Sequence, residues 1–408
     1  MTDLQPSLQG ALEFAHAIEK ARQIMLSAPW YLFSDSPLQE QAAAERQLKH
    51  QISAALDEGF IVHNPDHPEF RTMTQHNQYG LCNPDNRYFI ATISTEGDYV
   101  IRGKRGSSAS LEIQIGTGNP GYDENLTSPI TISQLSEKDL VVGKDGHFEI
   151  IISDTKPDGC RNWLCNSSGD ALANSVLIRE SFMDWEKETG GTWYIERTDL
   201  SGKPSPNPSL AVVNDQYARA SEYLINSTKG WVKFVDRLRA NLASGRLSPP
   251  RATQDGSGLP GQWNAAGFFP MEADDALIIT VPESQARYQS IQIGDLWFNA
   301  LDFCHRQTSL TAAQAYKSQD GKYRFVVSAQ DPGVPNWLDP SGTQNLFVFM
   351  RWQGLPKRHK FTEAPTAQMV KIKDLRELFA SEPYFRPKQR TEQLAARKAS
   401  LLTVPRGF

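Results

Sequence analysis

Ile113-Gln114-Ile115-Gly116 occurs a second time as Ile291-Gln292-Ile293-Gly294, 178 positions further along the 408-residue chain. Alternating β-branched residues ahead of a glycine are typical of a strand that leads into a turn. Four other blocks return in the same order, at offsets between 172 and 177. These blocks pair Asp98–Ile101 with Asp275–Ile278, Asp145–Phe148 with Asp320–Tyr323, Asn162–Leu164 with Asn336–Leu338, and Arg179 with Arg351. Five matches in one order indicate that the chain carries the same module twice.

The residue pattern of both copies is typical of β-structure. Short runs of alternating or β-branched residues, such as 88–93 and 288–293, are separated by turn signals that include Asp145-Gly146. Glycine accepts the positive φ that a tight hairpin turn needs, so Asp-Gly between two such runs predicts a hairpin. The sequence therefore predicts a mainly β fold, with two antiparallel β-sandwich modules that arose by internal duplication.

Helical periodicity flanks and separates the two modules. Apolar residues at helical spacing predict two helices within 8–58, one helix over 214–243 capped by Asn214 or Asp215, and two final helices around 372–379 and 389–402. The second helix of the first pair is expected to start at Ser36-Pro37. We expect an N-terminal helical region at 1–62, a first sandwich at 63–200, a helical insert and linker at 201–265, a second sandwich at 266–360 and C-terminal helices at 361–408.

The composition narrows the class of protein. With 39% hydrophobic and 22% charged residues the chain is typical of a globular protein. The net charge of −5 argues against nucleic acid as a partner, because phosphate binding needs a basic face. We see no membrane span and no signal peptide. Four irregularly spaced cysteines favour a reduced, cytoplasmic protein.

The two copies differ most between Asp302 and Ser309. Here the second copy has an ionisable cluster, whereas the first copy offers roughly Ser128-Pro129-Ile130. In a catalytic interpretation, His305 is the general acid–base, Asp302 fixes its tautomer and Arg306 holds an anionic group. In the alternative, Asp302 and Arg306 form a structural ion pair and His305 closes a loop.

Five further residues are candidates for substrate binding. Arg351 and the copy-specific Arg161 could bind an anion, and Asn336 could position a substrate by hydrogen bonding. Trp337 and Trp297 could line an apolar pocket. Because both copies contain Asn-Trp-Leu, that motif is explained equally well as sandwich architecture.

Three histidines, His63, His67 and His76, lie in one polar passage. Pro65 and Pro68 prevent the helix that would bring the first two to one face, so we expect no metal site there. No phosphate-binding glycine loop or zinc-protease helix occurs either, and we expect no cofactor.

The stretches around 302–309 and 331–338, followed by Met350-Arg351-Trp352, resemble the bacterial domain-of-unknown-function family 1214. The resemblance covers residues 60–400. It implies a jelly-roll-like β-sandwich in each module, and brings no agreed reaction or catalytic residues.

These observations favour an enzyme that works by cofactor-free acid–base chemistry, of lyase, isomerase or hydrolase type. Its substrate would be a small, largely apolar metabolite with an anionic or hydroxyl group. Two alternatives stay open: a non-catalytic protein that binds a small molecule or carbohydrate, and a structural or assembly module. Whether the chain forms a homo-oligomer is open too.

Overall fold

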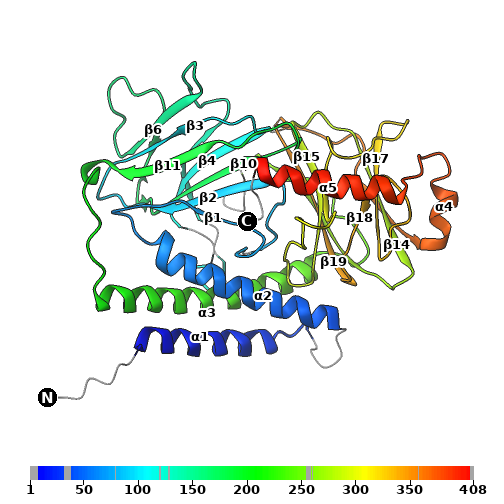
Figure 1. Cartoon of the computed structure of the whole chain (residues 1–408), viewed down its shortest axis with the longest axis horizontal. Helices are drawn as coiled ribbons and strands as arrows, with labels where there is room; N and C mark the ends of the chain where they lie inside the picture. The colour runs from blue at the N-terminus through cyan, green and yellow to red at the C-terminus, as the bar shows by residue number, and fades with distance from the viewer. Residues whose placement is uncertain are drawn as a thin grey trace.

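The computed structural model describes residues 8–31, 38–78, 80–118, 121–126, 129–253, 259, 261–356 and 358–404. It contains two β-sandwiches, with three helices packed beneath them and two at the C-terminal end (Figure 1). The predicted mainly β fold with flanking helices is confirmed.

The first sandwich consists of a five-stranded sheet, in the order β1-β2-β10-β4-β5, and a four-stranded sheet, in the order β11-β3-β6-β7. Buried side chains from both sheets fill the space between them, Ile101, Ile113 and Ile150 among them. The strands are β1 (Arg71–Thr72), β2 (Asn86–Thr92), β3 (Tyr99–Lys104), β4 (Ser110–Gly116), β5 (Thr131–Ser136), β6 (His147–Ser153), β7 (Trp163–Cys165), β10 (Ser175–Ser181) and β11 (Thr192–Arg197), with a small hairpin of β8 (Ser167–Ser168) and β9 (Ala171–Leu172).

The second sandwich repeats this order strand for strand. Its sheets run β12-β13-β19-β15-β16 and β18-β17-β14-β20. The strands are β12 (Arg251–Ala252), β13 (Trp263–Pro270), β14 (Asp275–Pro282), β15 (Tyr288–Gly294), β16 (Ser309–Thr311), β17 (Lys322–Ser328), β18 (Trp337–Leu338), β19 (Asn345–Gln353) and β20 (Thr366–Lys371). The same order in both modules, together with the sequence repeat, confirms the internal duplication.

The register of the short edge strands agrees as well, whereas the pairing of β3 with β6 and of β14 with β17 makes Asp98 equivalent to Ala276, one residue from the match in the sequence. Ile151 on β6 lies opposite Trp163 on β7, and Val326 on β17 lies opposite Trp337 on β18. Both of these pairs are parallel, whereas the other pairs of named strands are antiparallel. Each sandwich is therefore antiparallel except for one short edge strand, which the Asn-Trp-Leu motif supplies.

Asn162 and Asn336 hold this edge in the same way. Each side chain accepts a hydrogen bond from a loop amide, of Val141 or Tyr316, at 2.7 Å. Each amide nitrogen also donates to that residue's carbonyl oxygen and to a carbonyl on the neighbouring strand, at 2.7–3.2 Å. The role as scaffold, rather than as substrate contact, accounts for the presence of this asparagine in both copies.

The helices differ from the prediction mainly at their ends. The long helix α3 (Leu210–Asn241) begins four residues before Asn214, because the hydroxyl of Ser209 accepts the Val212 amide at 3.2 Å. The predicted start of α2 at Ser36-Pro37 lies outside the described residues. The remaining helical segments are α1 (Gln9–Leu26), α2 (Leu38–Asp57), η1 (Glu58–Val62), η2 (Thr198–Leu200), η3 (Ile372–Asp374), α4 (Leu375–Leu378) and α5 (Pro387–Thr403).

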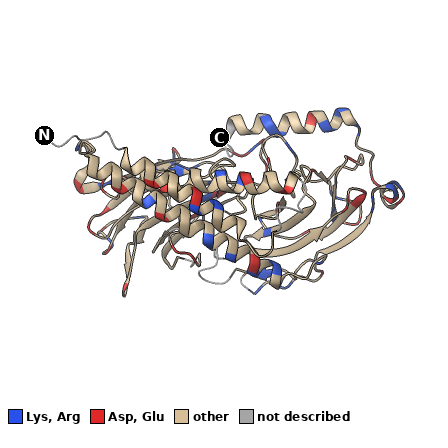
Figure 2. Cartoon of the chain, turned by 90° about the horizontal axis from the view of Figure 1, so that it is seen from below, with Lys and Arg blue, Asp and Glu red and all other residues tan. Residues whose placement is uncertain are grey.

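The helices α1, α2 and α3 pack on one another through small and apolar residues, among them Ala21, Ala54 and Leu224. A further buried cluster joins them to both sandwiches and includes Trp185 and Trp297. Figure 2 shows charges of both signs interspersed along the helices of this face. Among the described residues, no helix combines the length and the apolar character needed to cross a bilayer.

Replacement of either asparagine of the repeated motif should cost similar stability. Asn162→Ala and Asn336→Ala each leave buried backbone groups without a partner, which costs about 2–3 kcal/mol. Urea unfolding followed by far-ultraviolet circular dichroism measures the loss. Asn207→Ala, at an exposed position, is the control and should change the free energy of unfolding by less than about 0.5 kcal/mol. A loss at only one of the two motifs would contradict their equivalence.

Candidate functional site

The copy-specific segment forms the connection between β15 and β16, and it begins at a buried carboxylate. Asp295 Oδ1 accepts hydrogen bonds from the backbone amides of Trp297 and Asn299, both at 3.0 Å. Burial raises the pKa of Asp295 to about 6, although the hydrogen bonds from Asn299 and the charge of Arg46 oppose the shift. Hydrogen bonds to the buried Asp295 thus hold the start of the connection, ahead of the predicted catalytic residues.

Asp302 and His305 form a hydrogen-bonded pair at the surface. His305 Nδ1 lies 3.0 Å and 3.1 Å from the two carboxylate oxygens of Asp302. Asp302 also accepts the His305 backbone amide at 3.1 Å, so it both closes the turn and orients the ring. The His305 side chain is 48% exposed. Its Nε2 meets no polar partner in the part of the chain that the structure describes, so it faces solvent with the other nitrogen held.

His76 joins this pair from a distant part of the sequence. Gln78 and the backbone of Ala300 exchange two hydrogen bonds, at 2.9 Å and 3.2 Å, which fix the 74–78 loop beside the 295–306 connection. Desolvation lowers the pKa of His76, as do Lys49 and His305, whereas the charge of Asp302 raises it. One histidine from each of the two groups that the sequence singled out thus lies within electrostatic reach of the other.

Helix α2 supplies the remaining charges. Lys49 lies at the exposed surface, and partial desolvation and the neighbouring Arg46 lower its pKa. His50, on the buried side, lies 3.4 Å from Asn299 through Nδ1. Burial, followed by the charge of Lys49, lowers the pKa of His50 to about 3. We define Lys49, His76, Asp302 and His305 as the acid–base cluster.

The acid–base cluster can do two things chemically. A histidine whose Nδ1 is held by a carboxylate presents Nε2 as a proton acceptor or donor near neutral pH. A nearby ammonium group with a lowered pKa can hold an anionic oxygen or give up its proton. The sequence missed Lys49 and His76 because neither lies near residue 302 along the chain.

Arg306 is not part of this cluster. Its guanidinium forms an ion pair with Asp339 at 2.8 Å. The side chain of Gln307 also donates to the carbonyl oxygen of Trp337, so the turn is fastened to β18. This ion pair has a structural explanation and involves Asp339 instead of Asp302.

The predicted binding residues lie apart from one another. The indole of Trp337 is buried and donates to the Ser328 carbonyl at 3.0 Å. Trp297 is buried against Trp30 and Tyr31, with ring centroids 4.7 Å and 5.2 Å away. These two side chains serve the core instead of an apolar pocket, since large rings gain most from burial.

Arg351 is buried between the two modules. It donates to Gln292 Oε1 at 2.7 Å and to the Leu81 carbonyl at 3.4 Å. In the first module, Arg179 contacts Gln114 in the equivalent position. The two arginines are thus repeated elements of the sheets, which explains their place in the sequence repeat.

Arg161 lies on the first sandwich, away from the acid–base cluster. It is exposed at the rim of a hollow of about 640 Å³, which Ile151 and Cys160 also line. The structure therefore does not join Arg161 with His305 in one site.

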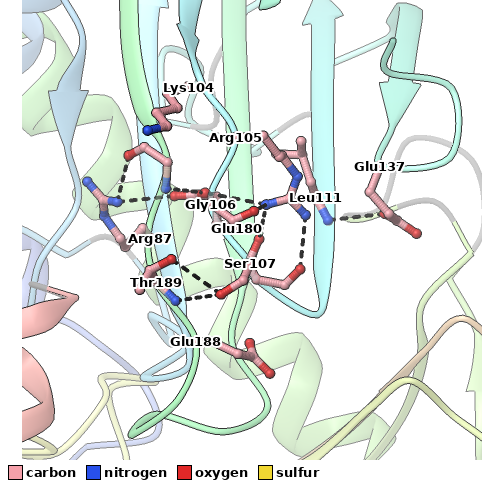
Figure 3. A network of polar contacts seen from close by, with 12 residues as sticks. Arg87, Lys104, Arg105, Gly106, Ser107, Leu111, Glu137, Glu180, Glu188 and Thr189 are labelled. Atoms are coloured by element: carbon pink, nitrogen blue, oxygen red, sulfur yellow. Dashed lines mark hydrogen bonds and ion pairs between the residues drawn. The ribbon is translucent and has the colours of Figure 1, made fainter. Parts of the chain in front are cut away.

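A buried ionic network lies elsewhere in the first sandwich (Figure 3). Glu180, fully buried, pairs with Arg87 at 3.2 Å and accepts the Gly191 amide at 2.8 Å. Arg105 lies 4.0 Å from the same carboxyl group and also bonds to Ser108. Burial raises the pKa of Glu180, and both arginines oppose the shift. The network connects strands and loops and satisfies its own charges, so we assign it to the architecture.

The three histidines of the polar passage do not form one group. Desolvation and the charge of Arg219 lower the pKa of His63, whereas the charges that act on His76 are those of Lys49, Asp302 and His305. Within the described ranges, no three His, Cys, Asp or Glu side chains gather in a way that could hold a metal ion.

Comparison with known proteins supports the fold and assigns no chemistry. Residues 265–373 match the family model DUF1254, described as a protein of unknown function. A crystal structure of an uncharacterised protein from Burkholderia cenocepacia is similar, with a TM-score of 0.76 and 25% identity over 90% of this chain and 98% of that chain. The VPA0106 protein from Vibrio parahaemolyticus has a TM-score of 0.44 and 12% identity, over 87% of this chain and 100% of that chain. No curated protein matches the chain.

His50 should make the fold sensitive to acid. Its pKa of about 3 in the folded state lies below the ordinary 6.5, so between these values the unfolded chain binds one proton more than the folded one. Stability then falls with falling pH, by up to about 1.4 kcal/mol per pH unit. In His50→Gln this part of the slope should disappear, as measured by urea unfolding between pH 6.5 and 4. The exposed His147→Gln is the control; an unchanged slope in His50→Gln would contradict the burial of a neutral ring.

Proposed function

We propose that the protein is an enzyme that transfers protons to or from a small molecule at the acid–base cluster. The observation that carries the proposal is the geometry of His305, whose Nδ1 is held by both oxygens of Asp302 while its Nε2 faces solvent. This arrangement fixes one tautomer and leaves the reactive nitrogen accessible, which general acid–base catalysis requires. His305 would exchange the proton and Asp302 would orient it.

The neighbours of His305 suggest the class of substrate. Desolvation, and then the charge of the exposed Lys49, lower the pKa of His76. A substrate with a carboxylate, phosphate or enolate oxygen would place that oxygen toward Lys49 and a transferable proton toward His305. Lys49 supports an anionic group on the predicted substrate. The apolar part has no support from Trp297 or Trp337, because both rings are buried.

The proposal includes several finer points. They are the resemblance to family 1214, the jelly-roll character of each sandwich, a cytoplasmic location, and a small-molecule partner in place of nucleic acid. The lyase, isomerase or hydrolase type of the reaction is a proposal as well.

The chain offers a matched control for the dyad. His147 Nδ1 lies 2.9 Å from Asp145 Oδ2, on a hairpin where the two side chains are 63% and 70% exposed. This second pair has the same hydrogen bond as Asp302 and His305, but it has neither Lys49 nor His76 beside it. If orientation by a carboxylate were sufficient, both pairs would be reactive to the same degree.

Hydrolysis of p-nitrophenyl acetate, a general reporter of a reactive imidazole, tests the proposal without knowledge of the substrate. We expect His305→Gln to lower the protein-dependent rate at least about tenfold and Asp302→Asn to lower it too, because the tautomer is no longer fixed. His147→Gln should leave the rate unchanged. Equal rates for wild type and His305→Gln, with unchanged melting temperature, would remove the acid–base assignment and favour a binding or structural role.

A further inference from the structure

The two modules differ in what covers the outer face of their four-stranded sheets. In the second module, Ile278, Val326 and Trp337 form this face, and Leu375 and Phe379 from the C-terminal segment pack against it. Figure 1 shows α4 and α5 beside this module, at the red end of the chain. An apolar outer face that is covered in this way stabilises the fold by its burial.

The C-terminal segment also fits one loop of the second module closely. Tyr384 packs over Gly333, where an added Cβ would lie 2.3 Å from the ring, and the Phe385 amide donates to the Gly333 carbonyl at 2.7 Å. The guanidinium of Arg390 then contacts Asp331 at 2.9 Å and the Val334 carbonyl at 2.6 Å. The contact therefore consists of an aromatic ring over a glycine, followed by a helix that one charged side chain anchors.

The corresponding surface of the first module is more polar, and none of the described residues covers it as the C-terminal segment covers the second. Ile151 and Trp163 stand in register as Val326 and Trp337 do. Gly159 has a φ of +71°, close to the +76° of Gly333, yet a Cβ there would meet nothing within 4 Å. The hollow of about 640 Å³ lies at this place, and Val141, at its rim, is 39% exposed.

The charged groups at this surface differ between the copies: the second module offers Asp331 to the segment, whereas the first module adds Arg161 to a hollow that Glu149 and Asp158 also line. Arg161 stands where the second module has Pro335, and in the part of the chain described here no carboxylate pairs with it. The other arginine of the hollow, Arg102, is already paired with Glu149 and Glu196. A segment that docked here as α5 does on the second module would therefore meet an unpaired cation near the place of the Arg390 anchor.

We propose that this hollow is a docking surface for a helical segment of another protein. The segment would place an aromatic side chain over Gly159, apolar residues on Val141 and Ile151, and a carboxylate against Arg161. The chemistry of the partner follows from the second module, in which the equivalent surface is covered by an aromatic residue and a helix, and from the cation that Arg161 adds where the second module has Pro335. The proposal is independent of the acid–base cluster.

Two fluorescent peptides test the surface on the full-length protein. One has the sequence of residues 382–403 and the other is the same peptide with Arg390→Glu. Fluorescence anisotropy should show that the Glu peptide binds more tightly than the native peptide. Arg161→Glu in the protein should weaken binding of the Glu peptide at least tenfold, and Gly159→Asn, which tolerates a positive φ, should also weaken it.

The control is Arg251→Glu, which reverses an exposed charge elsewhere and should leave binding unchanged. Three results would overturn the proposal. The first is no saturable binding up to about 1 mM peptide, the limit of weak association. The second is equal affinity for wild type and Arg161→Glu. The third is a dimer in analytical ultracentrifugation that Arg161→Glu abolishes, because the occupant would then be a second copy of this chain.

Discussion

The hydrogen bond between Asp85 and Tyr288 joins the two sandwiches, and the rest of the structure depends on it. Asp85 belongs to the segment that enters the first sandwich, and Tyr288 starts β15 of the second. The carboxylate is fully buried; it accepts the Tyr288 hydroxyl at 2.7 Å and the Trp185 indole at 3.0 Å. A buried carboxylate without such donors would cost several kcal/mol. Burial and this carboxylate raise the pKa of Tyr288 far above its ordinary value, so the hydroxyl remains a donor.

This bond fixes how the preceding segment runs across the second module. The carbonyl oxygen of Cys82 accepts from Gln292 at 2.7 Å, and that of Leu81 accepts from Arg351. A few residues earlier, Gln78 is bonded to Ala300 on the copy-specific connection. The loop that contains His76 is therefore held against the connection of Asp302 and His305 by the same seam that joins the modules. The second module supplies Asp302 and His305 to the acid–base cluster. His76 comes from the loop ahead of the first module and Lys49 from α2, so neither copy could form the cluster alone.

The sequence predicted the fold well because the repeated blocks show which strands of the two modules are equivalent. Blocks such as Ile-Gln-Ile-Gly and Asn-Trp-Leu fix the strand order, and alternation fixes the buried face. The same blocks contain the Arg179–Gln114 and Arg351–Gln292 pairs, so their equivalence could have been found from the sequence. The parallel edge strand could not, because a three-residue strand has no periodicity of its own.

The site was predicted only in part. Asp302 and His305 were found because only the second copy has them, and their spacing of three allows one side chain to close the turn on the other. Lys49 and His76 were missed because their position depends on tertiary contacts, of His50 with Asn299 for α2 and of Gln78 with Ala300 for the loop of His76. Trp297, Asn336 and Trp337 were chosen for their chemical type. In the structure the two tryptophans are buried in the core, and Asn336 holds the sheet edge by hydrogen bonds.

A double-mutant cycle with Asp85→Asn and Tyr288→Phe tests the central claim most directly. Urea unfolding of wild type, both single variants and the double variant gives the coupling energy of the two side chains. If the seam joins the modules, the wild type should unfold in one transition and the coupling should be about 1–3 kcal/mol. Additive losses within about 0.5 kcal/mol, with two separate transitions already in the wild type, would contradict it.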